Sequence, residues 1–118
     1  MASFLFVLSR GPEDVTRATR CLHLAKVAAD KGHKVSVFLV DEGVYLSNLA
    51  LAERMKAPTG DELMPYVRFL QDKGATFHVC KPCAETRLIS ADDLPQGFVI
   101  DTSATLIDLA VEAKVFSF

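Results

Sequence analysis

Short runs of apolar residues recur along the chain and alternate with stretches whose apolar side chains repeat every three or four residues. Five runs have the length and the β-branched or aromatic content of strands, namely residues 4–8, 35–40, 75–79, 98–100 and 115–118. Helical spacing connects them over residues 12–31, 61–73, 84–88 and 103–113. Because these runs lack polar alternation, they are typical of parallel strands covered on both faces.

The signals at the ends of the helical stretches agree with this division. Pro12-Glu13-Asp14 is a favourable helix start with acidic first-turn residues, and Lys31-Gly32 and Lys73-Gly74 are cationic helix ends followed by a glycine. Strands that alternate with helices through short turns favour right-handed crossovers and a mostly parallel sheet. The predicted fold is a three-layer α/β/α sandwich with a sheet of about five strands.

One stretch, residues 44–58, is apolar around too much of a helical circumference for a helix that covers a surface with one side. Val44, Leu46, Leu49, Leu51 and Met55 are its apolar members. Two interpretations remain open: the segment is buried on two sides, or it forms an interface.

Length and charge limit the classes of protein that need to be considered. A chain of 118 residues is one domain, 1–118, and half of its residues are apolar. The net charge of -2, without a basic cluster, argues against nucleic acid as a partner. No apolar stretch approaches the roughly 18 residues that cross a bilayer, and the apolar first nine residues lack a cationic leader. We therefore expect a cytoplasmic protein without membrane attachment.

Chemically active side chains gather where the predicted strands end. Asp41 and Glu42 follow the second strand, and Cys80-Lys81-Pro82-Cys83 follows the third. In parallel α/β sheets, ligands bind beyond the carboxyl ends of the strands. Two cysteines three residues apart at a strand-to-helix junction therefore predict a thiol site.

Three features favour the thiolate form of such a cysteine: free backbone N–H groups, the helix dipole, and the positive charges of Lys81 and Arg87. Asp41 and Glu42 are candidate acid or base groups beside the thiols, although such a pair is more often a solvated turn. We expect no cofactor and no metal at the site.

Other interpretations of the cysteines remain open from the residues alone. Cys80 could be a small apolar residue that finishes a buried strand, as we expect of Cys21 in the first helix. A Cys-x-x-Cys pair is also half of a zinc site, and His78 shares a strand face with Cys80, but the other half is missing. A thioredoxin-like dithiol carries its pair earlier in the order of elements.

The chain resembles the DsrE/DsrF-like sulfur-relay proteins, a family that includes TusD-type and YchN-like members. The likeness lies in Gly11-Pro12 after the first strand, Gly32-His33 before the second and Glu42-Gly43-Val44-Tyr45 after it, and further along in Gly74, Cys80 and Gln96-Gly97-Phe98. It spans nearly the whole length. Many members with a Cys-x-x-Cys motif have Arg-Gly where this chain has Arg87-Leu88.

The resemblance implies that Cys80 accepts persulfide sulfur from a donor protein and passes it to an acceptor protein, in the manner of a sulfurtransferase. Cys83 would either attack the Cys80 persulfide or stay passive. The resemblance also implies trimers or hexamers, or hetero-oligomers with subunits of the same fold. The alternatives are a non-catalytic oligomeric scaffold or ligand-binding protein and a thioredoxin-like dithiol redox protein.

Overall fold

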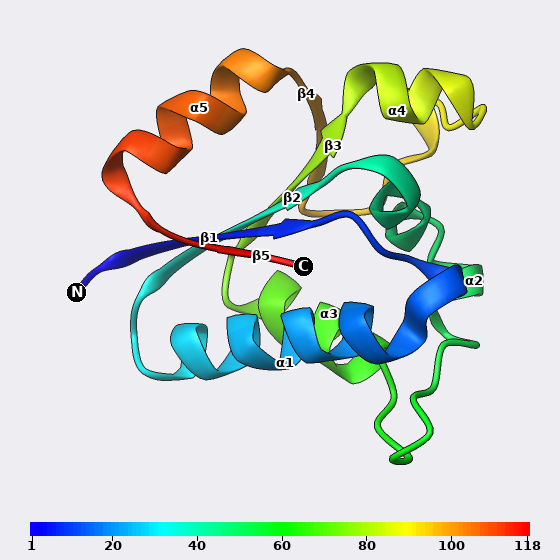
Figure 1. Cartoon of the computed structure of the whole chain (residues 1–118), viewed down its shortest axis with the longest axis horizontal. Helices are drawn as coiled ribbons and strands as arrows, with labels where there is room; N and C mark the ends of the chain where they lie inside the picture. Colours follow the sequence, from blue (N-terminus) through cyan, green and yellow to red (C-terminus); the bar gives the residue numbers. More distant parts are fainter.

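The computed structural model of the chain describes all 118 residues and contains one five-stranded sheet (Figure 1). Every pair of neighbouring strands is parallel. The strands lie in the order β4-β3-β2-β1-β5. Their bounds are β1 Ser3–Leu8, β2 Lys34–Leu39, β3 Thr76–Cys80, β4 Phe98–Asp101 and β5 Lys114–Ser117. The predicted parallel sheet of about five strands is confirmed.

Helices lie on both sides of this sheet. In Figure 1, α1 and α3 lie below it and α4 and α5 above it, so the predicted three-layer α/β/α arrangement is also confirmed. The α-helices are α1 Val15–Asp30, α2 Leu49–Ala52, α3 Met64–Asp72, α4 Lys81–Thr86 and α5 Ser103–Glu112. Short 3-10 helices are η1 Pro12–Asp14, η2 Asp41–Ser47 and η3 Ala91–Asp93.

The helices that precede β2 and β3 end in the same way. Gly32 and Gly74 have φ angles of 88° and 76°, in the left-handed region that favours glycine. The next residue in each case, His33 or Ala75, donates its N–H to a carbonyl in the last turn of the helix, at 3.1 and 3.0 Å. The two Lys-Gly signals in the sequence therefore mark true helix ends.

The main core lies between the sheet and the α1/α3 layer. Phe6, Val37 and Phe77 project from neighbouring strands into it and are no more than 1% exposed. Alternation along the strands places Leu5, Phe38 and other residues on the opposite face.

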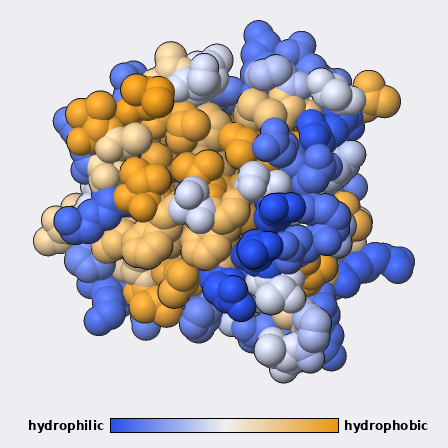
Figure 2. Space-filling model, viewed as in Figure 1, coloured by the Kyte–Doolittle hydropathy of each residue, from blue (hydrophilic) through white to orange (hydrophobic).

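That opposite face is covered less completely. Helix α5 has no buried residue: Leu106, Leu109 and Ala110 are half-buried, whereas Ile107 and Val111 are exposed. Every residue of the edge strand β5 is exposed as well. Figure 2 shows the resulting apolar surface over α5 and β5.

The strongly apolar segment 44–58 is buried within the chain itself. Val44, Leu46 and Ala52 are fully buried and Met55 is 3% exposed. Burial within the chain accounts for Val44, Leu46 and Met55, whereas Leu49 and Leu51 are half-buried. The apolar surface that remains for a partner lies instead on α5 and β5.

The loops after β1 and β2 fit together at their backbones. A Cβ atom on Gly11 would overlap the carbonyl oxygen of Glu42, and one on Gly43 would overlap that of Leu8. These loops carry the rim of the sheet on which Asp41 and Glu42 lie. Their mutual contact therefore fixes the position of η2 beside the end of β3.

We predict that Gly43→Ala lowers the free energy of unfolding by about 3 kcal/mol, because the overlapping atom belongs to the backbone of β1 and cannot rotate away. Gly60→Ala is the matched control. No atom lies near its added Cβ, so only its left-handed backbone, with φ of 93°, costs stability, about 1 to 2 kcal/mol. Urea denaturation measures both; equal losses would contradict the interlocked loops.

Candidate functional site

The two cysteines of the predicted site lie next to each other at the carboxyl end of β3. Cys80 is the last residue of the strand and the N-cap of α4, and Cys83 is the third residue of that helix. Both are half-buried free thiols. Helix α4 starts directly after the strand, so the motif forms the strand-to-helix junction that its position in the sequence predicts.

The surroundings of Cys80 favour the thiol over the thiolate. Burial raises the pKa of the Cys80 thiol, the neighbouring Cys83 thiol raises it further, and the charge of Asp41 adds to this, whereas the Cys83 backbone N–H lowers it. The helix-end N–H thus lowers this pKa as expected, but the net shift is upward, and neither Lys81 nor Arg87 is among its causes. One reason is that α4 has only six residues and is a weak dipole.

A second reason is that Arg87 is committed to other partners. Its guanidinium donates to both Glu42 carboxylate oxygens, at 2.7 and 3.4 Å, and to the Cys83 carbonyl at 3.1 Å. The hydrogen bond from Arg87 lowers the pKa of Glu42, and the same bond raises the pKa of Arg87. This pair ties the end of α4 to η2. Because the Arg87 guanidinium already pairs with Glu42, it does little to stabilise a thiolate.

The other two predicted supporting residues lie on either side of the thiols. Lys81 is exposed at the first position of α4. Asp41 is exposed at the start of η2 and has a φ of 49°, which is unusual for a residue with a side chain. The structure thus brings Asp41 near Cys80, pairs Glu42 with Arg87, and shows no ion pair between Lys81 and a carboxylate.

A histidine–aspartate pair that the sequence did not predict lies on the same sheet face as Cys80. His78 Nδ1 is 2.9 Å from Asp101 Oδ2, and the His78 ring stacks on Phe38 at a centroid distance of 5.5 Å. Burial alone would raise the pKa of Asp101, but hydrogen bonding by Thr105, by His78 and by the Thr102 N–H lowers it.

The register of the sheet explains this pair. Cys80 pairs with Asp101, so the carboxylate lies beside the thiol strand and within reach of His78 two residues earlier. The sequence placed His78 and Cys80 on one face of the strand. It did not show that Asp101 faces them, since this requires the strand order.

The remaining cysteine behaves as predicted. Cys21 is fully buried in α1, and burial raises its pKa to about 12, which confirms its assignment as a core thiol. No cluster of three or more His, Cys, Asp or Glu side chains is placed to hold a metal ion. None of the helices combines the length and apolar character needed to cross a membrane.

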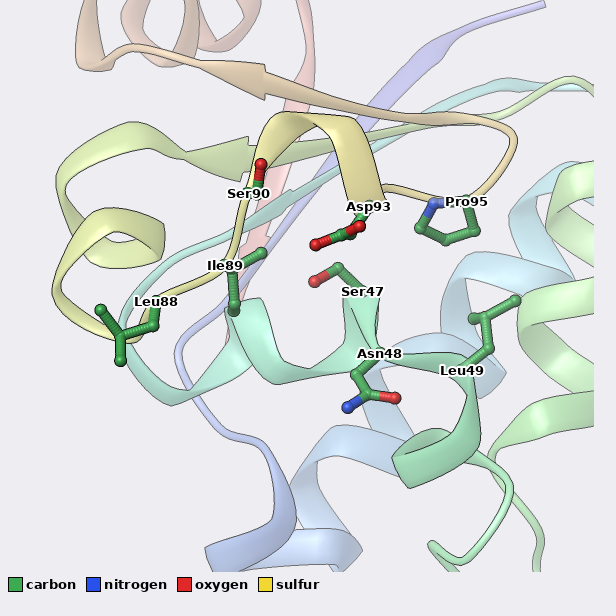
Figure 3. Close-up of a pocket in the computed structure, with 8 residues that line it drawn as sticks. All are labelled: Ser47, Asn48, Leu49, Leu88, Ile89, Ser90, Asp93 and Pro95. Atoms are coloured by element: carbon green, nitrogen blue, oxygen red, sulfur yellow. The ribbon is translucent and has the colours of Figure 1, made fainter.

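A hollow of about 470 Å³ lies beyond the end of α4, between residues of η2, α2 and the η3 region (Figure 3). Ser47 and Asp93 face each other across it, while Leu88 points away from it. Leu88 has a φ of 59° and is 93% exposed, at the position after the α4 C-cap where glycine is favoured. Neither Cys80 nor Cys83 lines this hollow.

The comparisons with known proteins agree with this architecture. The sequence model of the DsrE/DsrF-like family matches residues 2–118, and the chain belongs to this family. An uncharacterized protein of Methanopyrus kandleri is 29% identical over 110 residues, 91% of this chain and 85% of the relative. One from Methanocaldococcus jannaschii is 28% identical over 113 residues, 93% of each chain.

Two solved structures have the same fold. The ychN protein from E. coli superposes with a TM-score of 0.83 at 22% sequence identity, and a protein of unknown function from Methanobacterium thermoautotrophicum with a TM-score of 0.74 at 15%. Each superposition covers 100% of both chains. The expected resemblance to the DsrE/DsrF-like and YchN-like proteins is therefore confirmed.

We predict that Cys80 is alkylated by iodoacetamide with a pH midpoint above that of a small free thiol titrated beside it, because burial and Cys83 raise its pKa. The thiolate is the reactive form, so the rate follows its population. In Cys83→Ala the midpoint moves down, since one of the raising groups is gone. Peptide mass spectrometry assigns the modified residue, and a wild-type midpoint below that of the free thiol would contradict the described surroundings.

Proposed function

We propose that this protein carries sulfur as a persulfide on Cys80, accepting it from a donor persulfide and delivering it to an acceptor thiol. The main support is one observation: Cys80 is a half-buried free thiol at the carboxyl edge of a parallel sheet, with a second thiol beside it. Membership of the DsrE/DsrF-like family supports the same role.

The openness of the site fits transfer between proteins. Neither cysteine lines the hollow beyond α4 or the cavity under α5. The donor and acceptor are therefore expected to be proteins that present a sulfur atom at their own surface. Free thiols of this kind persist in a reducing compartment, which favours the cytoplasm.

The transfer conserves atoms and electrons. The Cys80 thiolate attacks the outer sulfur of a donor R–S–SH, a new S–S bond forms at Cys80, and the donor S–S bond breaks. The donor leaves as a thiolate and takes up the proton that Cys80 lost. The net result is Cys80–S–SH and R–SH, with no external oxidant or reductant.

Cys83 determines how the sulfur leaves. If its thiolate attacks the inner sulfur of the Cys80 persulfide, sulfide is released and a Cys80–Cys83 disulfide forms. If Cys83 remains passive, an acceptor protein's thiol takes the outer sulfur and Cys80 returns to a thiol. The two thiols are close enough for the first route to follow sulfur uptake slowly when no acceptor is bound.

We further propose that the apolar surface over α5 and β5 is covered by other subunits of this fold, as trimers or hexamers. Val111 is 78% exposed on α5 near exposed Ile107, and Val115 and Phe116 are exposed on the two faces of the edge strand β5. A contiguous patch of this kind marks an association surface, and an edge strand leaves backbone groups unpaired.

The proposed function predicts that wild-type protein incubated with cysteine persulfide gains the mass of sulfur, whereas Cys80→Ser does not. In Cys83→Ser the added sulfur should persist longer, because the resolving thiol is absent. Cys21→Ser serves as the control and should load like wild type, since Cys21 is fully buried. Intact-mass spectrometry reports all four proteins.

Two results would contradict sulfur carriage. Equal loading of Cys80→Ser and wild type would remove Cys80 from the reaction. Formation of a Cys80–Cys83 disulfide in wild type, with no sulfur uptake under any condition, would instead favour a dithiol redox protein.

The association surface predicts that Val111→Lys gives a smaller particle than wild type at micromolar concentration, because a charged side chain would be buried between subunits. Thr86→Lys, on exposed α4, is the matched control and should leave the assembly intact. Size-exclusion chromatography with light scattering measures the mass. A wild-type protein that is monomeric under these conditions would contradict the proposed subunit interface on α5 and β5.

A further inference from the structure

We propose that His78, held by Asp101, is the base that takes the proton from Cys80 during sulfur transfer and returns it to the departing donor thiolate. This inference rests on the proposed sulfur-carrier function and assigns the proton step of that function. Asp101 has a positioning role in it, since it acts through the imidazole.

The contact between His78 and Asp101 determines which ring nitrogen is basic. Asp101 is a carboxylate at neutral pH, because hydrogen bonding lowers its pKa, and it accepts from His78 Nδ1 at 2.9 Å. In the proposed relay the carboxylate faces an Nδ1 that carries the proton, which leaves Nε2 as the nitrogen that acts as base. A second bond, from the Thr102 N–H at 2.8 Å, holds the other carboxylate oxygen in place.

The ring is fixed and its free nitrogen reaches solvent. Stacking of the imidazole on Phe38 is nearly coplanar, at an interplanar angle of 7°. Apart from Thr19 Oγ1, every fully buried side-chain nitrogen or oxygen has a hydrogen-bond partner. Nε2 of His78 has no partner within the chain, so it is not fully buried and can exchange a proton with an incoming group.

Cys80 is the reactive group nearest to the ring along the strand. The two residues lie on one face, about 6.6 Å apart at Cα for two residues of strand. Asp101 pairs with Cys80 in the register and holds the imidazole through Nδ1, so the His78–Asp101 pair lies beside the thiol end of β3. No direct hydrogen bond joins His78 to Cys80, so the proposed relay requires a bridging water between the ring and the thiol.

Cys80 needs a base because its surroundings keep it protonated. Burial and the neighbouring Cys83 keep Cys80 protonated at neutral pH, and Arg87 is engaged by Glu42. The acidic groups around the pair are Asp101 on β4, Asp41 at the start of η2, and Asp108 and Glu112 of α5, which border the cavity beside Ser36. None of these is positioned as a donor or acceptor to Nε2.

The proton step balances with the transfer. The Cys80 proton moves to Nε2 as the sulfur attacks the donor persulfide, and the imidazolium that forms is stabilised by Asp101. When the donor S–S bond breaks, the imidazolium gives the proton to the leaving thiolate. His78 ends in its starting state, so it is a catalyst and not a reactant.

The test uses the full chain in a Cys83→Ser background, where Cys80 is the only thiol that is not fully buried. The variant His78→Asn keeps an amide donor at the place of Nδ1 and lacks any group at Nε2. Rates of sulfur uptake from cysteine persulfide are compared between pH 6 and 10. The control is His23→Asn, at an exposed position of α1.

The proton relay predicts that uptake by His78→Asn is slower by about 100-fold at pH 7, a typical contribution of a general base. The ratio of the uptake rate of the Cys83→Ser background to that of His78→Asn should fall toward one as the pH rises, because solvent then deprotonates Cys80. Asp101→Asn should show the same pH trend with a smaller loss of uptake rate, because an amide at residue 101 can also stabilise the His78 tautomer that carries its proton on Nε2. His23→Asn should keep a ratio of one throughout.

Two outcomes would overturn the relay: a His78→Asn ratio of one at all pH values, or a loss that does not change with pH, which indicates a structural role. The failure of the sulfur-carrier function is separable. It would appear as no sulfur uptake by wild type at any pH, whereas failure of the relay alone leaves wild-type uptake intact and His78→Asn unchanged beside it.

Discussion

The parallel hydrogen-bonded register of β3 with β2 and β4 determines where every group of the candidate site lies. Pairing with β2 places Phe38 opposite His78, and pairing with β4 places Asp101 opposite Cys80. A shift of one residue would turn the thiol and the imidazole toward the α1/α3 core. The register is fixed because Phe77 and Val79, on the other face of β3, are fully buried in that core.

The rim around this strand end shields the sulfur more than it activates it. Arg87 holds α4 to η2 through Glu42, and the backbone contacts of Gly11 and Gly43 hold η2 against β1. These contacts fix the thiol, and burial together with the neighbouring Cys83 keeps it protonated. A carrier that keeps its sulfur neutral until a donor and a base act together is protected from random oxidation.

Much of the fold followed from local sequence signals, because each signal has a local physical cause. Apolar runs without alternation predicted parallel strands. Gly32 and Gly74 predicted helix ends, because glycine readily adopts the positive φ angles that both have in the structure. The location of Cys80 at the end of β3 followed from the same pattern. The core role of Cys21 followed from its place beside the apolar stripe of α1.

What the sequence did not predict depends on contacts between distant segments. The partner of Arg87 is Glu42, 45 residues away, and this pairing removes the expected activation of the thiol. Asp101 reaches His78 only because β4 lies next to β3. Whether segment 44–58 is buried or forms an interface likewise required the packing of η2 and α2 in three dimensions.

The central claim, that Cys80 carries the sulfur, is tested most directly by locating the sulfur within the protein. Wild-type protein exposed to cysteine persulfide would be alkylated, digested and analysed by tandem mass spectrometry, with the peptide that contains both Cys80 and Cys83 sequenced. The account predicts an alkylated persulfide on Cys80. A persulfide found on Cys83 while Cys80 is a simple alkylated thiol would contradict it.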